Sequence, residues 1–189
     1  MKQKVVCVFP SLNIGGAEKA LSFVANCCEQ SGKVVHAIYL YNTTQSIQLN
    51  PSITKELICL QRKGNIFKLS LDKLCFLAKF RRRIVQIKPN LIIVFQSDIT
   101  KAVVYSTLGL NIPIIGSERN DPTKFCKRLV SSYRWAYNRC DAVVYTLQGA
   151  MDFFKAGRKQ LVIPNPAVSR LHGDAIRHNS DKGNIVSAG

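Results

Sequence analysis

The sequence VVCVFPSLNIGGAEK, residues 5–19, contains an apolar strand, a short loop, a glycine pair and the beginning of a helix. Apolar residues then recur every three or four positions as far as Cys28, which gives this helix one apolar face. Gly15 and Gly16 allow the backbone to approach a ligand closely, and the N–H groups of a first helical turn favour an anion such as phosphate. The G-x-G-x-x-G spacing of nicotinamide sites and the G-K-[ST] of P-loops are both absent. We therefore predict a diphosphate site here, with an ordinary strand-to-helix turn as the alternative.

Segments with strand-like and helix-like patterns alternate along the chain as far as Pro164. The runs at 91–95 and 112–115 are continuously apolar, which is typical of strands covered on both faces. This alternation predicts an α/β fold: a Rossmann-like, doubly wound, mainly parallel sheet with helices on both faces. The predicted strands are 4–9, 34–41, 54–60, 91–95, 112–116, 142–145 and 160–163, and the predicted helices are 16–30, 69–87, 99–108, 124–138 and 147–155.

The pattern changes after Pro164. Residues 165–183 are polar and mixed in charge, whereas residues 184–189 resemble the beginning of a new strand. We therefore expect a Rossmann-like domain over 1–164, an interdomain linker over 165–183 and the start of a second domain over 184–189.

The cysteine and histidine content bounds the class of protein. Seven cysteines occur without a C-x-x-C pair, and most of them lie in apolar runs, where a free thiol behaves as a small hydrophobe. The three histidines have no partner at the spacing of metal ligands. We therefore expect a reduced, cytoplasmic protein with neither a disulfide, a metal nor a cofactor.

The chain has a formal net charge of +16, and this charge is unevenly distributed. From Arg62 to Lys88, nine basic residues stand against one acidic residue, Asp72. Such a field attracts nucleic acid, anionic lipid or phosphorylated substrates. Because no RNA-recognition, helix-turn-helix or zinc motif accompanies the charge, we do not expect nucleic acid to be the partner.

Four segments together resemble a known enzyme family. They are 13–19 (NIGGAEK), 116–122 (GSERNDP), 141–146 (DAVVYT) and 163–166 (IPNP), in that order. They look like the N-terminal, acceptor-side half of bacterial family 4 retaining glycosyltransferases of the GT-B fold. The resemblance covers essentially the whole chain and implies a second Rossmann-like domain that holds most of the nucleotide-sugar site. Since residues 185–189 resemble only the first strand of that domain, we expect this chain alone to bind the donor weakly and not to turn over.

The resemblance implies transfer of a sugar from a nucleotide-sugar donor to a lipid-linked glycan or polysaccharide precursor. Gly15 and Gly16 would donate backbone N–H groups to the donor diphosphate. Arg119 and Asn120 would orient sugar or phosphate as residues of the catalytic site, and Glu118 would contact acceptor hydroxyls there. Further residues expected at the acceptor or in the cleft are Gln96, Ser97, Asp98 and Asp121. The alternatives are a solvated turn for the loop after the strand at 112–116, and helix capping for Ser97 and Asp98.

The most basic of the predicted helices combines an apolar stripe with a cluster of arginines. Arg81, Arg82 and Arg83, together with Phe76 or Phe80, suit contact with an anionic membrane surface. With a lipid-linked acceptor, this favours a peripheral position at the inner face of the plasma membrane. The alternative is an ordinary amphipathic helix with a solvated basic face.

Two other functions compete with this interpretation. The first is a basic nucleic-acid-binding domain, and the second is a non-catalytic α/β domain that binds a nucleotide without transferring anything. Salt-dependent binding to DNA of any sequence would favour the first of these, whereas binding to anionic vesicles would favour the glycosyltransferase.

Overall fold

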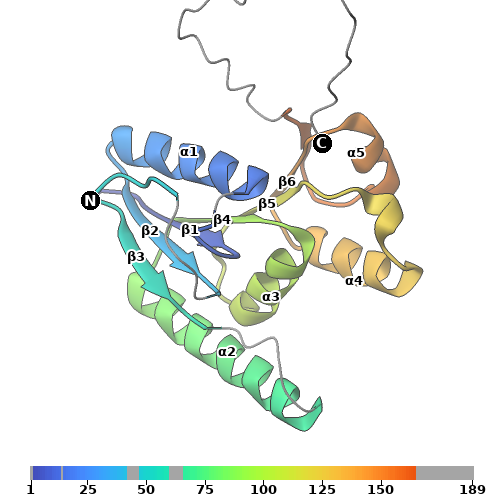
Figure 1. Cartoon of the computed structure of the whole chain (residues 1–189), viewed down its shortest axis with the longest axis horizontal. Coiled ribbons are helices and arrows are strands. Elements are labelled where there is room, and N and C mark those ends of the chain that lie inside the picture. Colours follow the sequence, from blue (N-terminus) through green and yellow to red (C-terminus); the bar gives the residue numbers. More distant parts are fainter. Residues whose placement is uncertain (1, 14, 42–46, 60–65, 165–189) are drawn as a thin grey trace, which may run out of the picture.

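The computed structural model describes residues 2–13, 15–41, 47–59 and 66–164 (Figure 1). The linker predicted over 165–183 and the strand predicted over 184–189 lie outside the described residues. The strands of the described part are β1 (Lys4–Phe9), β2 (Val34–Tyr39), β3 (Thr54–Leu57), β4 (Leu91–Phe95), β5 (Ile114–Glu118), β6 (Ala142–Tyr145) and β7 (Gln160–Val162). Its helices are α1 (Gly16–Gln30), α2 (Ile66–Ile87), α3 (Ser97–Thr107), α4 (Lys127–Tyr137) and α5 (Gln148–Phe154), with a short 3-10 helix, η1 (Pro122–Lys124).

The strands form one sheet in the order β3-β2-β1-β4-β5-β6-β7, and every neighbouring pair is parallel. The chain moves outward from β1 to β3 and then returns to place β4 against the other side of β1. The predicted Rossmann-like α/β class is therefore confirmed. The point where the strand order reverses lies between β1 and β4, and in open parallel sheets ligands bind outside the carboxyl ends of the strands at such a point.

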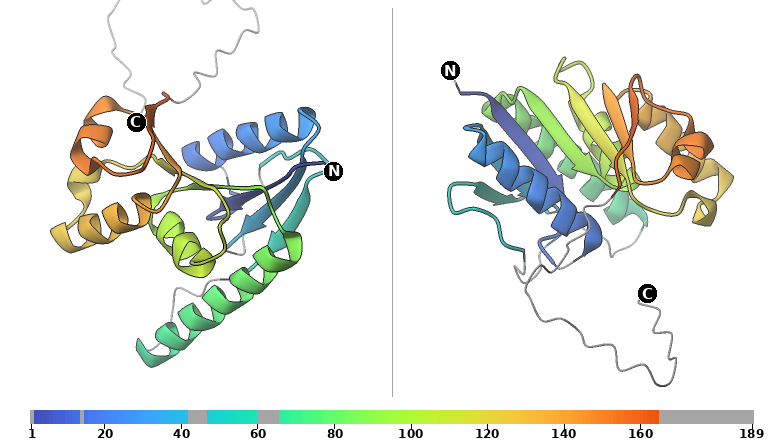
Figure 2. Two further views of the ribbon diagram at one scale, coloured as in Figure 1. Left: turned by 180° about the vertical axis from the view of Figure 1, so that it is seen from behind. Right: turned by 90° about the horizontal axis from the view of Figure 1, so that it is seen from above.

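Helices cover both faces of the sheet, but unequally (Figure 2). Successive residues of a strand point to opposite faces, so β1 contributes to two separate cores. Val6 and Val8 pack with buried residues of α2, α3, α4 and α5, whereas Val5, Cys7 and Phe9 pack with those of α1. Right-handed crossovers explain this division, because connections that run in opposite directions along the sheet place their helices on opposite faces.

Two element boundaries differ from the predictions in a way that affects the site. The fifth strand begins at Ile114 instead of residue 112 and continues through Ser117 and Glu118, which pair with Phe95 and Tyr145 of the neighbouring strands. The helix predicted over 124–138 is divided into η1 and α4. Ser117 and Glu118, expected in the loop after this strand, therefore belong to the sheet.

The prediction that Phe76 and Phe80 contact a membrane is wrong. Their side chains are 2% and 0% exposed, and the two rings pack against each other within the core beneath α2. The apolar stripe of a helix that covers a parallel sheet packs against that sheet. Only the other face of α2 is therefore exposed to solvent. Among the residues of α2 whose side chains the structure describes, the exposed large apolar ones are Leu74, at 63%, and Val85, at 48%.

Within the described ranges, no helix has the combination of length and apolar character needed to cross a membrane. The longest of them, α2, spans 22 residues but carries basic side chains along its length. The same part of the chain contains no group of three or more His, Cys, Asp or Glu side chains placed to hold a metal ion.

We predict that Phe80→Ala lowers the free energy of unfolding by roughly 3–5 kcal/mol, because it leaves a cavity in a close-packed core. The matched control is Leu74→Ala on the same helix, which should change it by less than about 0.5 kcal/mol. Urea denaturation followed by circular dichroism measures both. Equal effects of the two substitutions would contradict the orientation of α2.

The thiols provide a second test of the packing. Burial raises the pKa of the Cys140 thiol to about 12 and also raises the pKa of Cys7. Both thiols are buried, whereas Cys59, Cys75 and Cys126 are exposed. We expect iodoacetamide at pH 8 to label the three exposed thiols of the folded chain rapidly and to label Cys7 and Cys140 only after unfolding. Peptide mass spectrometry reads the order of labelling, and rapid labelling of Cys140 would contradict the packing of α4 on β5.

Candidate functional site

The amino end of α1 follows the carboxyl end of β1 at the point where the strand order reverses. Gly15 is the N-cap residue in an extended conformation (φ −136°, ψ 160°), and its carbonyl accepts a hydrogen bond from the N–H of Lys19 at 2.9 Å. In the described part of the chain, no side chain caps this helix. The first-turn N–H groups and the positive end of the helix dipole therefore face the edge of the sheet where a ligand is expected.

The two glycines at this helix entry differ in their surroundings. A Cβ atom at Gly15 would collide with the carboxylate of Glu18, which lies over the entry. A Cβ atom at Gly16 would meet nothing within 4 Å. A larger side chain at Gly16 would therefore project into the open space from which a ligand approaches, without disturbing the fold.

Glu118 lies at the end of β5 and is 0% exposed. One carboxylate oxygen accepts hydrogen bonds from the backbone N–H groups of Arg119 and Asn120, both at 2.8 Å. The other accepts from the Tyr137 hydroxyl at 2.6 Å and from the Ser97 hydroxyl. The predicted contact of Glu118 with acceptor hydroxyls is therefore wrong, because protein donors already occupy both oxygens. Glu118 instead fixes the backbone of the loop that follows β5.

The phenol of Tyr137 completes this buried network from α4. Burial raises the pKa of Tyr137 well above its ordinary value, and the neighbouring Glu118 carboxylate raises it as well. The hydroxyl therefore stays protonated and remains a donor across the physiological pH range. An apolar spacing along α4 marks Tyr137 as inward-facing in the sequence, but nothing in the sequence identifies its partner 19 residues earlier.

Arg119 points to the opposite face of the sheet from Glu118. Its guanidinium lies 4.2 Å from the centre of the Phe95 ring, and Phe95 belongs to the core on the α1 side. The side chain is half-buried, and burial lowers the pKa of Arg119, although an arginine stays charged at neutral pH. Arg119 and the amino end of α1 thus lie on the same face and at the same edge of the sheet. Arg119 brings a positive charge to this edge, and the amino end of α1 brings its N–H groups beside the carboxylate of Glu18.

The three polar residues that follow β4 have different positions. Gln96 is half-buried with a φ of 75° and a ψ of 140°, a conformation that a residue with a side chain rarely adopts. Ser97 is buried at the start of α3 and donates to the Glu118 carboxylate. Asp98 accepts a hydrogen bond from the Tyr133 hydroxyl at 2.7 Å. Ser97 and Asp98 therefore hold α3, α4 and β5 together, and neither caps the helix.

Asp121 and Asn120 lie in the loop beyond Glu118. The side chain of Asp121 accepts hydrogen bonds from the backbone N–H and the hydroxyl of Thr123, at 3.0 and 2.7 Å, and so caps η1. Asn120 is exposed.

The predicted site residues thus fall into two groups. One group lies at the carboxyl edge of the sheet near the reversal point, and the other supports this edge through hydrogen bonds. The edge group is Gly15, Gly16, Gln96, Arg119 and Asn120, and the supporting group is Ser97, Asp98, Glu118 and Asp121.

No protein-family model and no curated protein sequence matches the chain. Its structure nevertheless resembles several solved structures. It matches the Anabaena protein HepE in complex with UDP and glucose with a TM-score of 0.68 and 18% identity, over 86% of this chain and 44% of HepE. It matches the lipopolysaccharide outer core galactosyltransferase WaaB with a TM-score of 0.67 and 14% identity, over 87% of this chain and 46% of WaaB. It also matches a UDP-N-acetylglucosamine 2-epimerase with a TM-score of 0.59 and 14% identity, over 87% of this chain and 49% of that protein.

The fold is that of one half of a GT-B protein. The chain spans less than half the length of each of these three structures. The structural neighbours include glycosyltransferases, which agrees with the fold expected from the four segments quoted above. At these identities the likeness concerns the GT-B fold alone, and the epimerase shows that this fold serves more than one reaction.

We predict that Glu118→Ala destabilises the chain by about 3 kcal/mol or more, because it leaves several buried donors without an acceptor. Thermal or urea unfolding measures this loss. Asn120→Ala in the same loop is the control and should change stability by less than about 0.5 kcal/mol, because its side chain is exposed. A stability of Glu118→Ala close to that of the unsubstituted chain would contradict the network.

Proposed function

We propose that this chain is the acceptor-side half of a retaining glycosyltransferase, which moves a sugar from a nucleotide-sugar donor to a lipid-linked glycan or polysaccharide precursor. The observation that carries the proposal is the position of Arg119 and of the uncapped amino end of α1 on one face and at one edge of the sheet. Two positive groups at the point of strand reversal suit a diphosphate. The fold it shares with WaaB and with UDP-bound HepE supports the same assignment.

The proposed role of these groups is electrostatic. As the bond between the sugar C1 and the diphosphate oxygen breaks, negative charge grows on the diphosphate. The N–H groups at Gly15 and Gly16 and the guanidinium of Arg119 stabilise this charge more strongly in the transition state than in the bound donor. The acceptor oxygen forms the new bond to C1 on the same face, and its proton passes to the departing phosphate oxygen, so that no protein nucleophile is required. Asn120 and Gln96 orient the sugar or the acceptor.

The proposal assigns the remaining donor contacts to a second domain. Because the chain spans less than half of each matched structure, the site described above forms only one wall of an interdomain cleft. On this basis the chain alone binds the donor weakly and does not turn over. The proposed donor is a nucleotide sugar, and no metal or cofactor takes part in the reaction.

We also propose a peripheral position at the inner face of the plasma membrane, with α2 as the contact, but through residues that differ from those predicted. Arg81 donates to the carbonyl oxygens of Ser106 and Leu108, and Arg83 forms an ion pair with Glu56 at 2.5 Å. These two arginines are therefore engaged within the chain. Over residues 72–87 of this helix, the exposed cations are Lys73, Lys79 and Arg82, and the exposed Leu74 lies among them.

The donor site is tested by titrating the intact protein with UDP, GDP and ADP in a calorimeter. We expect one of these nucleotides to bind, and we expect each of two substitutions to weaken its binding about tenfold or more. Gly16→Val places a side chain in the open space beside the first-turn N–H groups, and Arg119→Gln removes a positive charge. Lys159→Gln is the control, because this exposed lysine lies at the opposite edge of the sheet. Unchanged affinity in both site variants would remove the loop and Arg119 from the mechanism.

The membrane contact is tested by co-sedimentation with vesicles that contain phosphatidylglycerol. Replacing Lys73, Lys79 and Arg82 by Gln should weaken binding about a hundredfold at low salt, because each basic residue near the surface contributes about 1 kcal/mol. The matched control is the Arg81/Arg83→Gln variant, which also removes charge from α2 but from engaged side chains. If both variants partition like the unsubstituted protein, α2 is an ordinary solvated helix. Tight binding to DNA instead of vesicles would favour a nucleic-acid partner.

A further inference from the structure

The carboxylate of Glu18 lies over the amino end of α1, at the candidate site. Glu18 belongs to the first turn of this helix and is half-buried. Its carboxylate lies so close to Gly15 that a Cβ atom there would collide with Oε2 and would stand 3.0 Å from Cδ. A residue other than glycine at position 15 would therefore push the carboxylate away. The missing side chain at Gly15 gives room to Glu18, whereas a Cβ atom at Gly16 would meet nothing within 4 Å.

The Glu18 carboxylate has no polar partner in the part of the chain that the structure describes. No group there donates a hydrogen bond to it or forms an ion pair with it. A glutamate three positions after an N-cap residue often accepts a hydrogen bond from the N-cap N–H, but Gly15 makes no such bond to Glu18. The position of this carboxylate therefore does not follow from ordinary helix capping.

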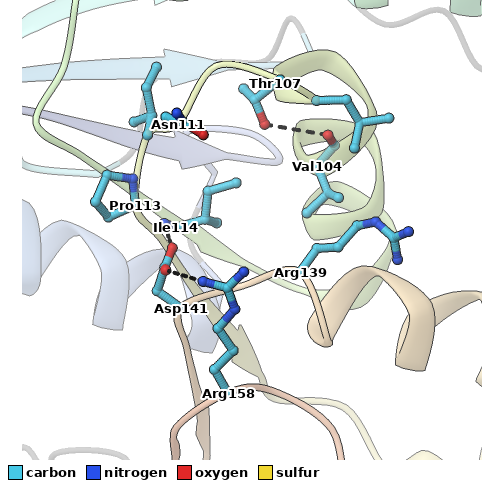
Figure 3. Close-up of a pocket in the computed structure, with 11 residues that line it drawn as sticks. Val104, Thr107, Asn111, Pro113, Ile114, Arg139, Asp141 and Arg158 are labelled. Atoms are coloured by element: carbon cyan, nitrogen blue, oxygen red, sulfur yellow. Dashed lines mark hydrogen bonds and ion pairs between the residues drawn. The ribbon is translucent and has the colours of Figure 1, made fainter.

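Most other carboxylates of the described residues are engaged within the chain. Asp141, at the opposite edge of the sheet, lies 3.4 Å from a guanidinium nitrogen of Arg158 and also accepts a backbone N–H at 2.9 Å (Figure 3). Glu29, near the carboxyl end of α1, accepts hydrogen bonds at 2.8 and 2.6 Å from two side chains of the segment before β3. Such contacts explain where those carboxylates lie. For Glu18, the attraction that remains is that of the helix terminus itself.

The amino end of α1 attracts an anion. Its first intrahelical bond runs from the N–H of Lys19 to the carbonyl of Gly15, so the N–H groups of Gly16, Ala17 and Glu18 have no intrahelical acceptor. Together with the helix dipole, these donors favour a negative charge beside the N-cap. The Glu18 carboxylate is such a charge, and it lies where a phosphate bound to these donors would also lie. The two anions do not fit there together, because like charges a few Å apart repel each other.

We propose that Glu18 is an internal competitor of the donor diphosphate. Its carboxylate takes the anion position at the amino end of α1 and moves aside when a diphosphate binds to the N–H groups of the first turn. When the nucleoside diphosphate leaves, the carboxylate returns, so Glu18 lowers the affinity of the site and favours product release. This inference rests on the proposed function, which supplies the diphosphate. It gives Glu18 and Arg119 opposite effects at the same edge of the sheet.

The test compares the intact protein with its Glu18→Gln variant in calorimetric titrations with inorganic diphosphate, at constant pH and ionic strength. We expect the variant to bind about tenfold more tightly, because the substitution removes a negative charge and keeps the size of the side chain. Glu29→Gln is the matched control and should leave the affinity unchanged, since it removes the same charge about 16 Å farther along α1. Backbone amide shifts of Gly16 and Ala17 in NMR spectra locate the bound anion at the helix terminus.

A purely structural role of Glu18 would change stability and not affinity. An acidic side chain in a first turn stabilises its helix, so Glu18→Gln should in any case lower Tm by about 1–4 °C. Unchanged or weaker binding of inorganic diphosphate in this variant would overturn the proposal. The same holds for an equal gain in Glu29→Gln, for a gain without shifts at Gly16 and Ala17, and for an absence of binding in every variant.

Parallel titrations with UDP, GDP and ADP separate this inference from the proposed function. If Glu18→Gln gains affinity for inorganic diphosphate but no nucleotide binds to it or to the unsubstituted protein, the competition at α1 stands and the assignment of the donor fails. If one nucleotide binds both proteins with equal affinity, the donor site stands and the role of Glu18 fails.

Discussion

The arrangement of the candidate site depends on one buried carboxylate. Removing Glu118 from water is costly, and four protein donors offset this cost: two backbone N–H groups of the following loop and the hydroxyls of Ser97 and Tyr137. These donors come from the loop, α3 and α4, so a single group sets the position of three segments around the end of β5. The loop that carries Arg119 and Asn120 is thus held through its backbone. The side chain of Asn120 is exposed, and that of Arg119 is half-buried against Phe95.

Glu118 and Arg119 lie on opposite faces of the sheet at this edge and have different roles. Because β5 alternates, Glu118 points to the face covered by α3 and α4, while Arg119 lies on Phe95 on the α1 face. The residue that supports the loop and the residue proposed to contact the ligand therefore lie on opposite faces of the sheet, one position apart in the sequence. The reversal of strand order between β1 and β4 places the amino end of α1 on the second of these faces. A diphosphate site at this position needs no residue from the sheet interior.

Several of the basic residues that give the chain its high positive charge are engaged within the fold. Arg83 forms an ion pair with Glu56, Arg81 covers the end of α3, and Arg134 donates to the carbonyl oxygens of Phe153 and Phe154. These arginines join elements of the fold through backbone and side-chain acceptors. Other cations lie in separate places: on the outer face of α2, at the amino edge of the sheet around Arg139 and Arg158, and at Arg119 beside the Phe95 ring. Charge counting along the sequence cannot separate these groups.

The local pattern of apolar residues in the sequence determined most of the helices and strands of this protein. The apolar periods of the sequence predict the bounds of α1 and the positions of all seven strands within a few residues, and with the short connections they predict the parallel, doubly wound sheet. They also predict that Gly15, Gly16 and Arg119 lie at the carboxyl edge of the sheet, where the structure has them, since the carboxyl ends of parallel strands coincide. Only the tertiary structure decided that Glu118 supports the loop, that Phe76 and Phe80 are core residues, and that Arg81 and Arg83 are engaged. Periodicity identifies which face of an element is apolar, but hydrogen bonds and ion pairs between groups about 20 to 30 residues apart depend on how the elements pack.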